Sequence, residues 1–149
     1  MVAVSKGFVT VAHGQVHYRH CGRGPLLVML HDSARSSLQH AASMEWLGEH
    51  FTVVAPDLPG CGNSAALPVG QREVPDYAAA LAATLFALGV ERCLLYGNHH
   101  GAAIALHFAA HHPARGALVV LDGLELQVPD EGPDVPVPKP SGQVPCDDG

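Results

Sequence analysis

Short apolar runs alternate with longer, helix-prone segments along most of the chain. Residues 8–11 and 16–20 flank a His-Gly-Gln turn, which predicts a β-hairpin whose second strand alternates like a half-exposed edge strand. The apolar runs that follow are continuous, as is typical of strands buried on both faces of a sheet. These predicted strands cover residues 26–30, 51–55, 92–96 and 117–121.

Helices are predicted between these strands, over residues 37–50, 75–88 and 101–112. Trp46, the only tryptophan, is expected to anchor the first helix to the sheet. Pro75 and Asp76 suit the first turn of the second helix, and Gly89 suits its left-handed C-terminal cap. The alternation predicts an α/β fold, with a mostly parallel sheet of about six strands flanked by helices on both faces.

The character of the chain changes after Leu126. Half of the 12 prolines lie beyond this point, together with several acidic residues and few large apolar ones. Such a composition cannot offset the entropy that is lost when a chain becomes ordered. The sequence therefore predicts one domain over residues 1–126 and a Pro/Asp-rich disordered tail over residues 127–149.

Composition and charge narrow the class of protein. The 149-residue chain is 48% hydrophobic and 15% charged, and its net charge is -6. The basic residues form no cluster, which disfavours a nucleic-acid or anionic-membrane partner. We see no signal-peptide pattern and no apolar run of membrane-spanning length. The four cysteines lack Cys-x-x-Cys spacing, so we expect a reduced, cytoplasmic protein.

The segment from 94 to 103 carries the strongest chemical signal. An apolar run stops at Gly97, and Gly101 opens an alanine-rich, helix-prone run four residues later. This is the layout of a nucleophile elbow, in which small residues let a strand and a helix approach closely around a strained central residue. That centre is normally Ser, Cys or Asp, but here it is His99.

Further motifs accompany this segment. They are Gly-x-Gly-Pro at residues 22–25, His31-Asp32 after the third predicted strand, and a D-x-x-G-x-G-x-S loop at residues 57–64. In this order and spacing, residues 8–126 resemble the N-terminal half of an α/β-hydrolase fold protein. The resemblance implies a truncated version of that fold, with the elbow at residues 97–101.

The resemblance also implies roles for single residues. The loop that begins with His31, Asp32 and Ser33 corresponds to the family's oxyanion-hole loop, and His100 would add a backbone N–H to that hole. Some family members place the catalytic acid after the sixth strand, where Asp122 stands. The family's catalytic histidine and closing strands have no counterpart in the sequence, since no histidine follows residue 112.

Two interpretations of His99 stay open. In one, its ring projects into the crevice at the carboxyl ends of the strands and acts as a general base, or as a nucleophile through an acyl-imidazole. In the other, it fills a turn that has lost its nucleophile. Asp32 places a carboxylate beside the oxyanion position, which disfavours ordinary ester hydrolysis unless the side chain points away.

Histidines also raise the question of a metal ion. His31, His99 and His100 follow strands that end at one edge of the sheet, but adjacent histidines seldom reach one ion. His107 and His111 share a helix face without the glutamate of the H-E-x-x-H motif. The sequence therefore predicts no metal site and no cofactor.

Two functions remain. The first is hydrolysis of a small ester, amide or related carbonyl compound, with weak or absent activity. The second is that of a non-catalytic binding or interaction module, or a truncated remnant of the family. In both cases strand 117–121 would leave an exposed apolar edge, so we expect the isolated chain to be marginally stable, to self-associate through this edge or to need a partner.

Overall fold

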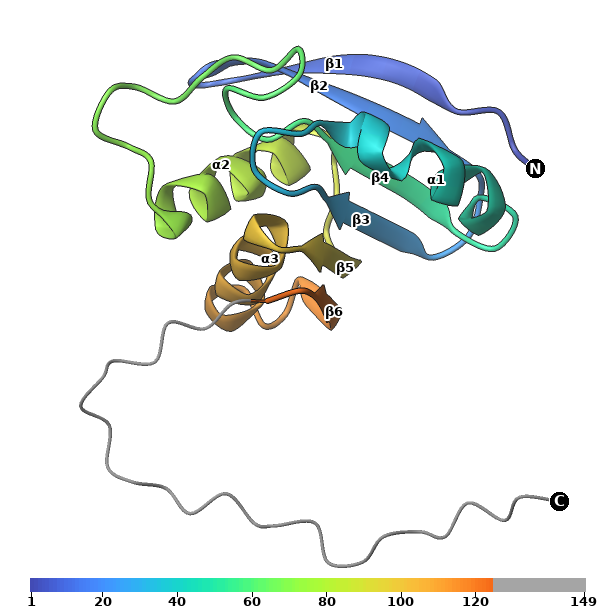
Figure 1. The fold of residues 1–149 in the computed structure, drawn as a ribbon. Coiled ribbons are helices and arrows are strands. Elements are labelled where there is room, and N and C mark those ends of the chain that lie inside the picture. Colours follow the sequence, from blue (N-terminus) through green and yellow to red (C-terminus); the bar gives the residue numbers. More distant parts are fainter. Residues whose placement is uncertain (125–149) are drawn as a thin grey trace, which may run out of the picture.

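The computed structural model describes residues 1–124, which form six strands, three α-helices and one 3-10 helix (Figure 1). The strands are β1 (Ser5–Val11), β2 (Gly14–Cys21), β3 (Leu26–Leu30), β4 (Thr52–Pro56), β5 (Cys93–Asn98) and β6 (Gly116–Asp122). The helices are η1 (Ser37–His40, the 3-10 helix), α1 (Ala41–Leu47), α2 (Val74–Ala87) and α3 (His100–His111). The predicted tail, residues 127–149, lies outside the described residues.

These strands form one sheet in the order β1-β2-β4-β3-β5-β6. The hairpin β1–β2 and the pair β2–β4 are antiparallel, whereas β3–β4, β3–β5 and β5–β6 are parallel. The mostly parallel α/β sheet is therefore confirmed. The expectation that the second hairpin strand lies at the edge is wrong. Of the two hairpin strands, β1 lies at the edge of the sheet, because β4 pairs with the other side of β2 along residues 18–21.

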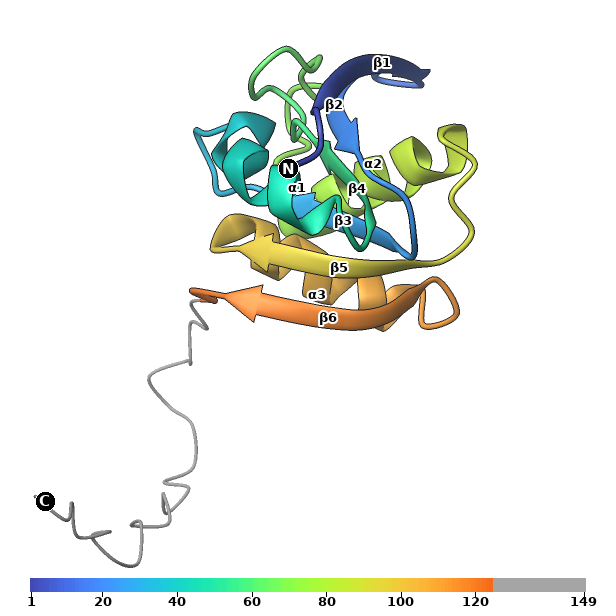
Figure 2. The same cartoon turned by 90° about the vertical axis from the view of Figure 1, so that its right-hand side faces the viewer.

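The helices lie on both faces of the sheet. Helices α2 and α3 cover one face, and η1 and α1 lie on the other (Figures 1 and 2). Leu30 and Leu95 of the sheet and Phe108 of α3 are fully buried in the cluster on this face. On the opposite face Met44 of α1 packs with Met29, in a smaller cluster. Within residues 1–124, no helix is long and apolar enough to cross a membrane.

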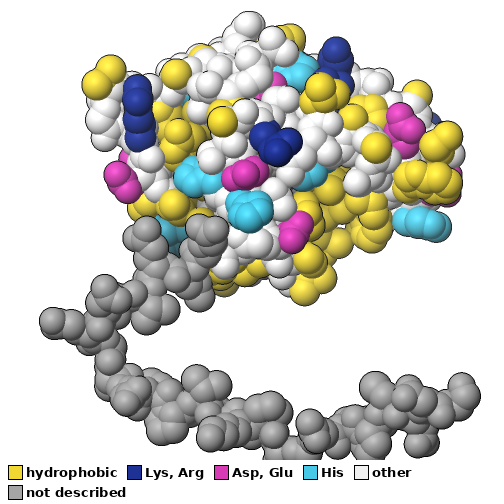
Figure 3. Space-filling view, viewed as in Figure 1, with side chains coloured by type: hydrophobic (Ala, Val, Ile, Leu, Met, Phe, Trp, Pro, Cys, Tyr) yellow, Lys and Arg dark blue, Asp and Glu magenta, His cyan; other side chains and the backbone are white. Residues whose placement is uncertain are grey.

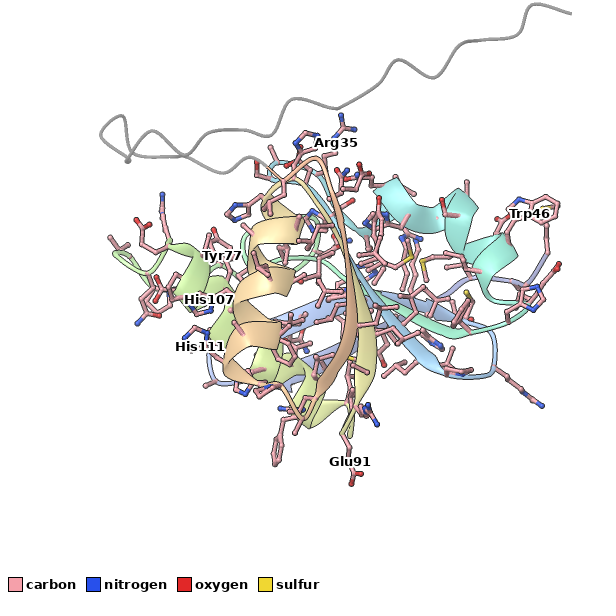
Figure 4. All side chains as sticks on the ribbon, turned by 90° about the horizontal axis from the view of Figure 1, so that it is seen from below. Arg35, Trp46, Tyr77, Glu91, His107 and His111 are labelled. Carbon is pink, nitrogen blue, oxygen red and sulfur yellow. The ribbon has the colours of Figure 1, made fainter. Side chains whose placement is uncertain are left out.

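The segment predicted as one helix over residues 37–50 is shorter and divided, with η1 leading into α1. Trp46 does not anchor it: its side chain is 64% exposed and projects away from the sheet (Figure 4). Two residues along a helix are about 200° apart around its axis, so Trp46 faces away from the buried Met44. Met44, rather than Trp46, therefore fixes this helix to the sheet.

The start and end of α2 follow the sequence prediction. Pro75 lies in its first turn, and Glu73 and Asp76 form a reciprocal capping box. Gly89 follows the last turn with a φ of 71°, the left-handed conformation expected for a C-terminal cap.

Part of the sheet is uncovered on the α1 face. At the end of the sheet, Leu118 and Val120 of β6 are 57% and 50% exposed. They border an apolar hollow of about 380 Å³ between α1 and the last strands. Hydrophobic side chains crowd the lower surface in Figure 3, around β5 and β6. The helices thus cover the centre of the sheet better than its β6 end.

A buried carboxylate ties several of these elements together. Asp57 follows β4 and accepts hydrogen bonds from the N–H groups of Ser37 (2.7 Å) and Asn63 (2.9 Å) and from the His17 ring (2.9 Å). The Ser64 hydroxyl donates to the Asp57 carbonyl at 2.8 Å. The first and last residues of the D-x-x-G-x-G-x-S motif are therefore in contact, and the carboxylate joins their loop to η1 and β2.

Replacing this carboxylate should cost stability in a pH-dependent way. Burial alone would raise the pKa of Asp57, but the hydrogen bonds from Ser37, Asn63 and His17 outweigh it and lower the pKa. The stabilisation is then complete above the ordinary aspartate pKa of about 4 and is lost as pH falls toward the lowered value. We expect Asp57→Asn to reduce the free energy of unfolding by about 3 kcal/mol at neutral pH.

Urea unfolding of both proteins between neutral pH and pH 3 measures this difference. The difference in the free energy of unfolding between wild type and Asp57→Asn should become smaller as the pH falls. The control variant Glu91→Gln, at an exposed position, should have the stability of wild type at every pH. A gap that stays constant with pH would contradict the assigned role of the Asp57 charge.

We propose that two copies associate through the open edge of β6. This edge carries exposed apolar side chains and has no lysine or proline to discourage pairing. Lysines at both Leu118 and Val120 should shift sedimentation-velocity profiles toward the monomer. Phe86→Lys, at a 79% exposed position on α2, is the matched control and should leave the profile unchanged. A wild-type monomer at every concentration would contradict this proposal.

Candidate active site

The turn between β5 and α3 places His99 at the carboxyl end of the sheet. His99 adopts φ 46° and ψ -109°, a combination that side-chain-bearing residues rarely occupy. Its N–H donates to the carbonyl of Asp122 at 2.8 Å, which joins the turn to the end of β6. Such a conformation persists only where surrounding contacts hold it.

Two glycines make this turn sterically feasible. A Cβ atom at Gly101 would lie 2.4 Å from the Leu30 carbonyl oxygen, and one at Gly97 would lie 2.3 Å from the carbonyl oxygen of Gly101. The first contact lets the start of α3 reach the end of β3, and the second lets β5 fold back against α3. The spacing noted in the sequence is therefore a packing requirement on both sides of His99.

A pocket of about 290 Å³ opens above this turn. Its lining comes from the loop after β3, the first turns of α3 and the residue after β6. The lining residues are Asp32, Ser33, His99, His100, Ala103 and Gly123. The structure thus brings together four of the six residues proposed from the sequence, and His31 and Asp122 are outside the lining.

Asp32 directs its carboxylate toward backbone N–H groups at the pocket. Its Oδ1 atom accepts from the N–H of Ser33 at 2.7 Å and, more weakly, from the N–H of His100 at 3.4 Å. Burial alone would raise the pKa of Asp32, but these N–H groups, together with electrostatic interactions with His99 and Arg35, lower it. The side chain is therefore an anion at neutral pH and lies in the pocket.

His31 is fully buried and serves the loop rather than the pocket. Its Nδ1 donates to the carbonyl of Asp32 at 2.7 Å, and its Nε2 accepts from the N–H of Leu58 at 2.9 Å. With these partners Nδ1 carries the proton and Nε2 does not, so the ring is neutral. Burial lowers the pKa of the ring, which also favours the neutral form. Both ring nitrogens are occupied, so the side chain positions Asp32 and is not available to a ligand.

Asp122 lies at the end of β6 but its carboxylate faces other partners. It accepts from the Tyr96 hydroxyl at 2.8 Å and from the Asn98 amide at 2.9 Å, and these hydrogen bonds lower its pKa. Within residues 1–124, no hydrogen bond joins it to the His99 ring. Asp122 thus holds the backbone of His99 and acts on its ring only through charge.

Sequence reasoning missed the residues that connect these groups. Gln39 donates to the Asn98 side chain at 2.8 Å and accepts from the N–H of Asp32 at 3.2 Å. It links Asp122, through Asn98, to the loop after β3. Tyr96 and Asn98 are two residues apart on β5, so their side chains lie on the same face of the sheet. This spacing could have predicted that both contact the neighbouring strand. Gln39 carries no such signal.

The histidines that suggested a metal ion do not converge. His31 is buried in the loop, whereas His99 is exposed in the pocket. The rings of His107 and His111 stack on α3 with centroids 4.1 Å apart, and His111 donates to the His107 carbonyl. In the described part of the chain, no three His, Cys, Asp or Glu side chains are grouped as an ion would require.

Comparison with known proteins places this geometry in a family. A family model described as the alpha/beta hydrolase fold matches residues 25–144. The chain is 29% identical over 125 residues to 2-hydroxy-6-oxo-6-phenylhexa-2,4-dienoate hydrolase of Burkholderia cepacia, an alignment covering 78% of this chain and 44% of that enzyme.

Solved structures give the same picture. Cfl2 from Burkholderia cenocepacia is 31% identical with a TM-score of 0.78, covering 89% of this chain and 47% of that one. The haloalkane dehalogenase DbeA from Bradyrhizobium elkani is 27% identical with a TM-score of 0.77, covering 82% of this chain and 42% of that one. The chain spans less than half the length of each of these proteins.

The packing at the turn can be tested with an added methyl group. Gly101→Ala would push a Cβ atom against the backbone of β3, so we expect it to lower the free energy of unfolding by about 3 kcal/mol or more. Gly89→Ala is the control, because Gly89 also has a positive φ but nothing within 4 Å of an added Cβ; its cost should be about 1 kcal/mol. Equal urea midpoints for the two variants would contradict the close approach.

Proposed function

Because the chain belongs to the alpha/beta hydrolase fold family, we propose that its pocket binds a small ester- or amide-type compound and hydrolyses it slowly through His99. The observation that carries this proposal is the position of His99. It is held in a strained turn between β5 and α3, and its ring lines the pocket. At about 290 Å³ the pocket suits a small molecule.

The chemistry available to His99 is that of an imidazole ring. A ring nitrogen can attack the substrate carbonyl carbon, release the alcohol or amine and leave an acyl-imidazole, which water then hydrolyses. The ring can instead take a proton from an attacking water. Within the described residues no hydrogen bond engages the ring, so its nitrogens are free for either role.

The same site explains why turnover should be slow. A hydrolase gains much of its rate from N–H groups that stabilise the developing oxyanion. The N–H groups of Ser33 and His100 point at the Asp32 carboxylate. Asp122, the proposed acid, is bound to Tyr96 and Asn98 and so does not orient the His99 ring.

A non-catalytic binding module is the second function that an observation favours. The Asp32 carboxylate satisfies the N–H groups that a transition state would need, and a pocket of this kind can hold a ligand without converting it. Hydrolysis measurements separate the two functions, since only the first requires a rate that depends on His99.

We also propose a reducing, cytoplasmic location. Cys21, Cys61 and Cys93 are free thiols, and burial raises the pKa of Cys93 to about 11. Thiols with raised pKa values are poor nucleophiles, as expected of cysteines that serve packing.

We expect His99→Ala to reduce hydrolysis of p-nitrophenyl acetate by about tenfold or more, after subtraction of the rate given by free imidazole. His50→Ala is the matched control, because His50 is an exposed histidine outside the pocket. It should retain the wild-type rate. His99→Ser should remain at the level of His99→Ala, because Asp122 is engaged elsewhere and no histidine follows residue 112.

Equal rates for wild type, His99→Ala and His50→Ala would overturn the catalytic proposal and favour the binding module. A large gain in rate for His99→Ser would show that an effective base stands near the turn.

A further inference from the structure

The Asp32 carboxylate occupies the place where the pocket would receive an anion. Its Oδ1 atom accepts from two backbone N–H groups that come from different elements, Ser33 in the loop after β3 and His100 at the start of α3. Converging backbone N–H groups at a helix N-terminus otherwise attract anionic ligands. Here the chain supplies that anion itself.

We propose that Asp32 determines the specificity of the pocket: its carboxylate closes the anion position, so the pocket takes small uncharged or cationic molecules and excludes anions. The proposal deepens the function given above, because it names the charge of the ligand that the same pocket accepts. It does not require that the ligand be hydrolysed.

The charges around the pocket support this selectivity. No Lys or Arg is among the pocket-lining residues of the described chain. Asp32 and Asp122 both interact electrostatically with His99, so the ring lies within the field of two carboxylates. An incoming carboxylate or phosphate would meet like charge from both and would have to compete with the Asp32 carboxylate for the N–H groups of Ser33 and His100.

The position of Asp32 is fixed by its neighbours. Its carbonyl accepts from the buried His31 ring, and its N–H donates to Gln39. The backbone therefore has partners on both sides of residue 32, independent of the side chain. Removing the carboxylate should free the N–H groups without releasing the loop, and this makes the side chain testable by substitution.

Two substitutions distinguish the effect of the negative charge of Asp32 from the effect of having an acceptor oxygen at the N–H groups. Asp32→Asn retains an oxygen that can accept from the same N–H groups but removes the negative charge. Asp32→Gly removes both the charge and the acceptor. Glu91→Gln is the matched control, since it removes an exposed carboxylate at the end of the molecule opposite Arg35 (Figure 4).

The experiment is a titration of the ¹⁵N-labelled full chain with acetate at neutral pH, followed through the amide signals of Ser33 and His100. We expect acetate to bind Asp32→Gly at least about tenfold more tightly than wild type, with Asp32→Asn between them and Glu91→Gln equal to wild type. Ethylammonium should show the reverse order, with its tightest binding to wild type.

Acetate shifts in wild type as strong as those in Asp32→Gly would overturn the proposal, as would ethylammonium binding that is indifferent to Asp32. The same spectra show whether each variant is folded. If Asp32→Gly is unfolded, the test rests on Asp32→Asn, which is nearly the same shape as wild type. In that case, an acetate affinity of Asp32→Asn equal to that of wild type would refute the proposal. These measurements need no turnover, so a failure of the His99→Ala test would leave them unaffected.

Discussion

The close approach of α3 to the end of β3 is the constraint on which the rest of the pocket depends. The backbone carbonyls of Leu30, at the end of β3, and of the next residue lie where a side chain at Gly101 would be, so the helix can begin directly beside the strand. This contact sets the direction of the His100 N–H and brings it to the loop that carries Asp32. His99, two residues before Gly101, has φ 46° and ψ -109°, and its ring lines the pocket.

A second constraint acts from behind the pocket. The buried Asp57 carboxylate fixes the start of η1, and the His31 ring contacts the N–H of Leu58 next to it. The loop after β3 is therefore attached at both ends to the segment that follows β4. Because these contacts lie in the protein interior, where charge-assisted hydrogen bonds are strong, the loop is fixed independently of any ligand. The pocket is accordingly a preformed feature of the fold.

The sequence predicted most of the fold because hydrophobic periodicity and turn residues act locally. It placed the strands, the cap of α2 and the glycines around His99. It failed for Trp46, since size alone suggested burial although Met44 occupies the buried face of the same helix. At the site, residue identities were accessible but side-chain directions were not. The Asp32 carboxylate could face solvent or the nearby N–H groups, and the Asp122 carboxylate could face His99 or Tyr96. Which direction each side chain takes depends on distances that only the folded chain defines.

Two features of the pocket depart from the pattern of the family, and they are chemically related: His99 at the centre of the elbow, and the Asp32 carboxylate beside the N–H groups of the oxyanion-hole loop. A serine nucleophile produces a negatively charged tetrahedral intermediate that needs empty N–H donors, and a carboxylate among those donors opposes it. Attack by histidine forms the same tetrahedral oxyanion, but the attacking ring becomes positively charged, and nearby carboxylates stabilise that charge. Asp32 and Asp122 both interact electrostatically with His99, and their negative charges oppose a negative charge on the oxygen of a substrate bound beside it. In the hydrolysis proposed above, formation and breakdown of the acyl-imidazole both pass through an oxyanion, so the Asp32 carboxylate would oppose each of the two steps.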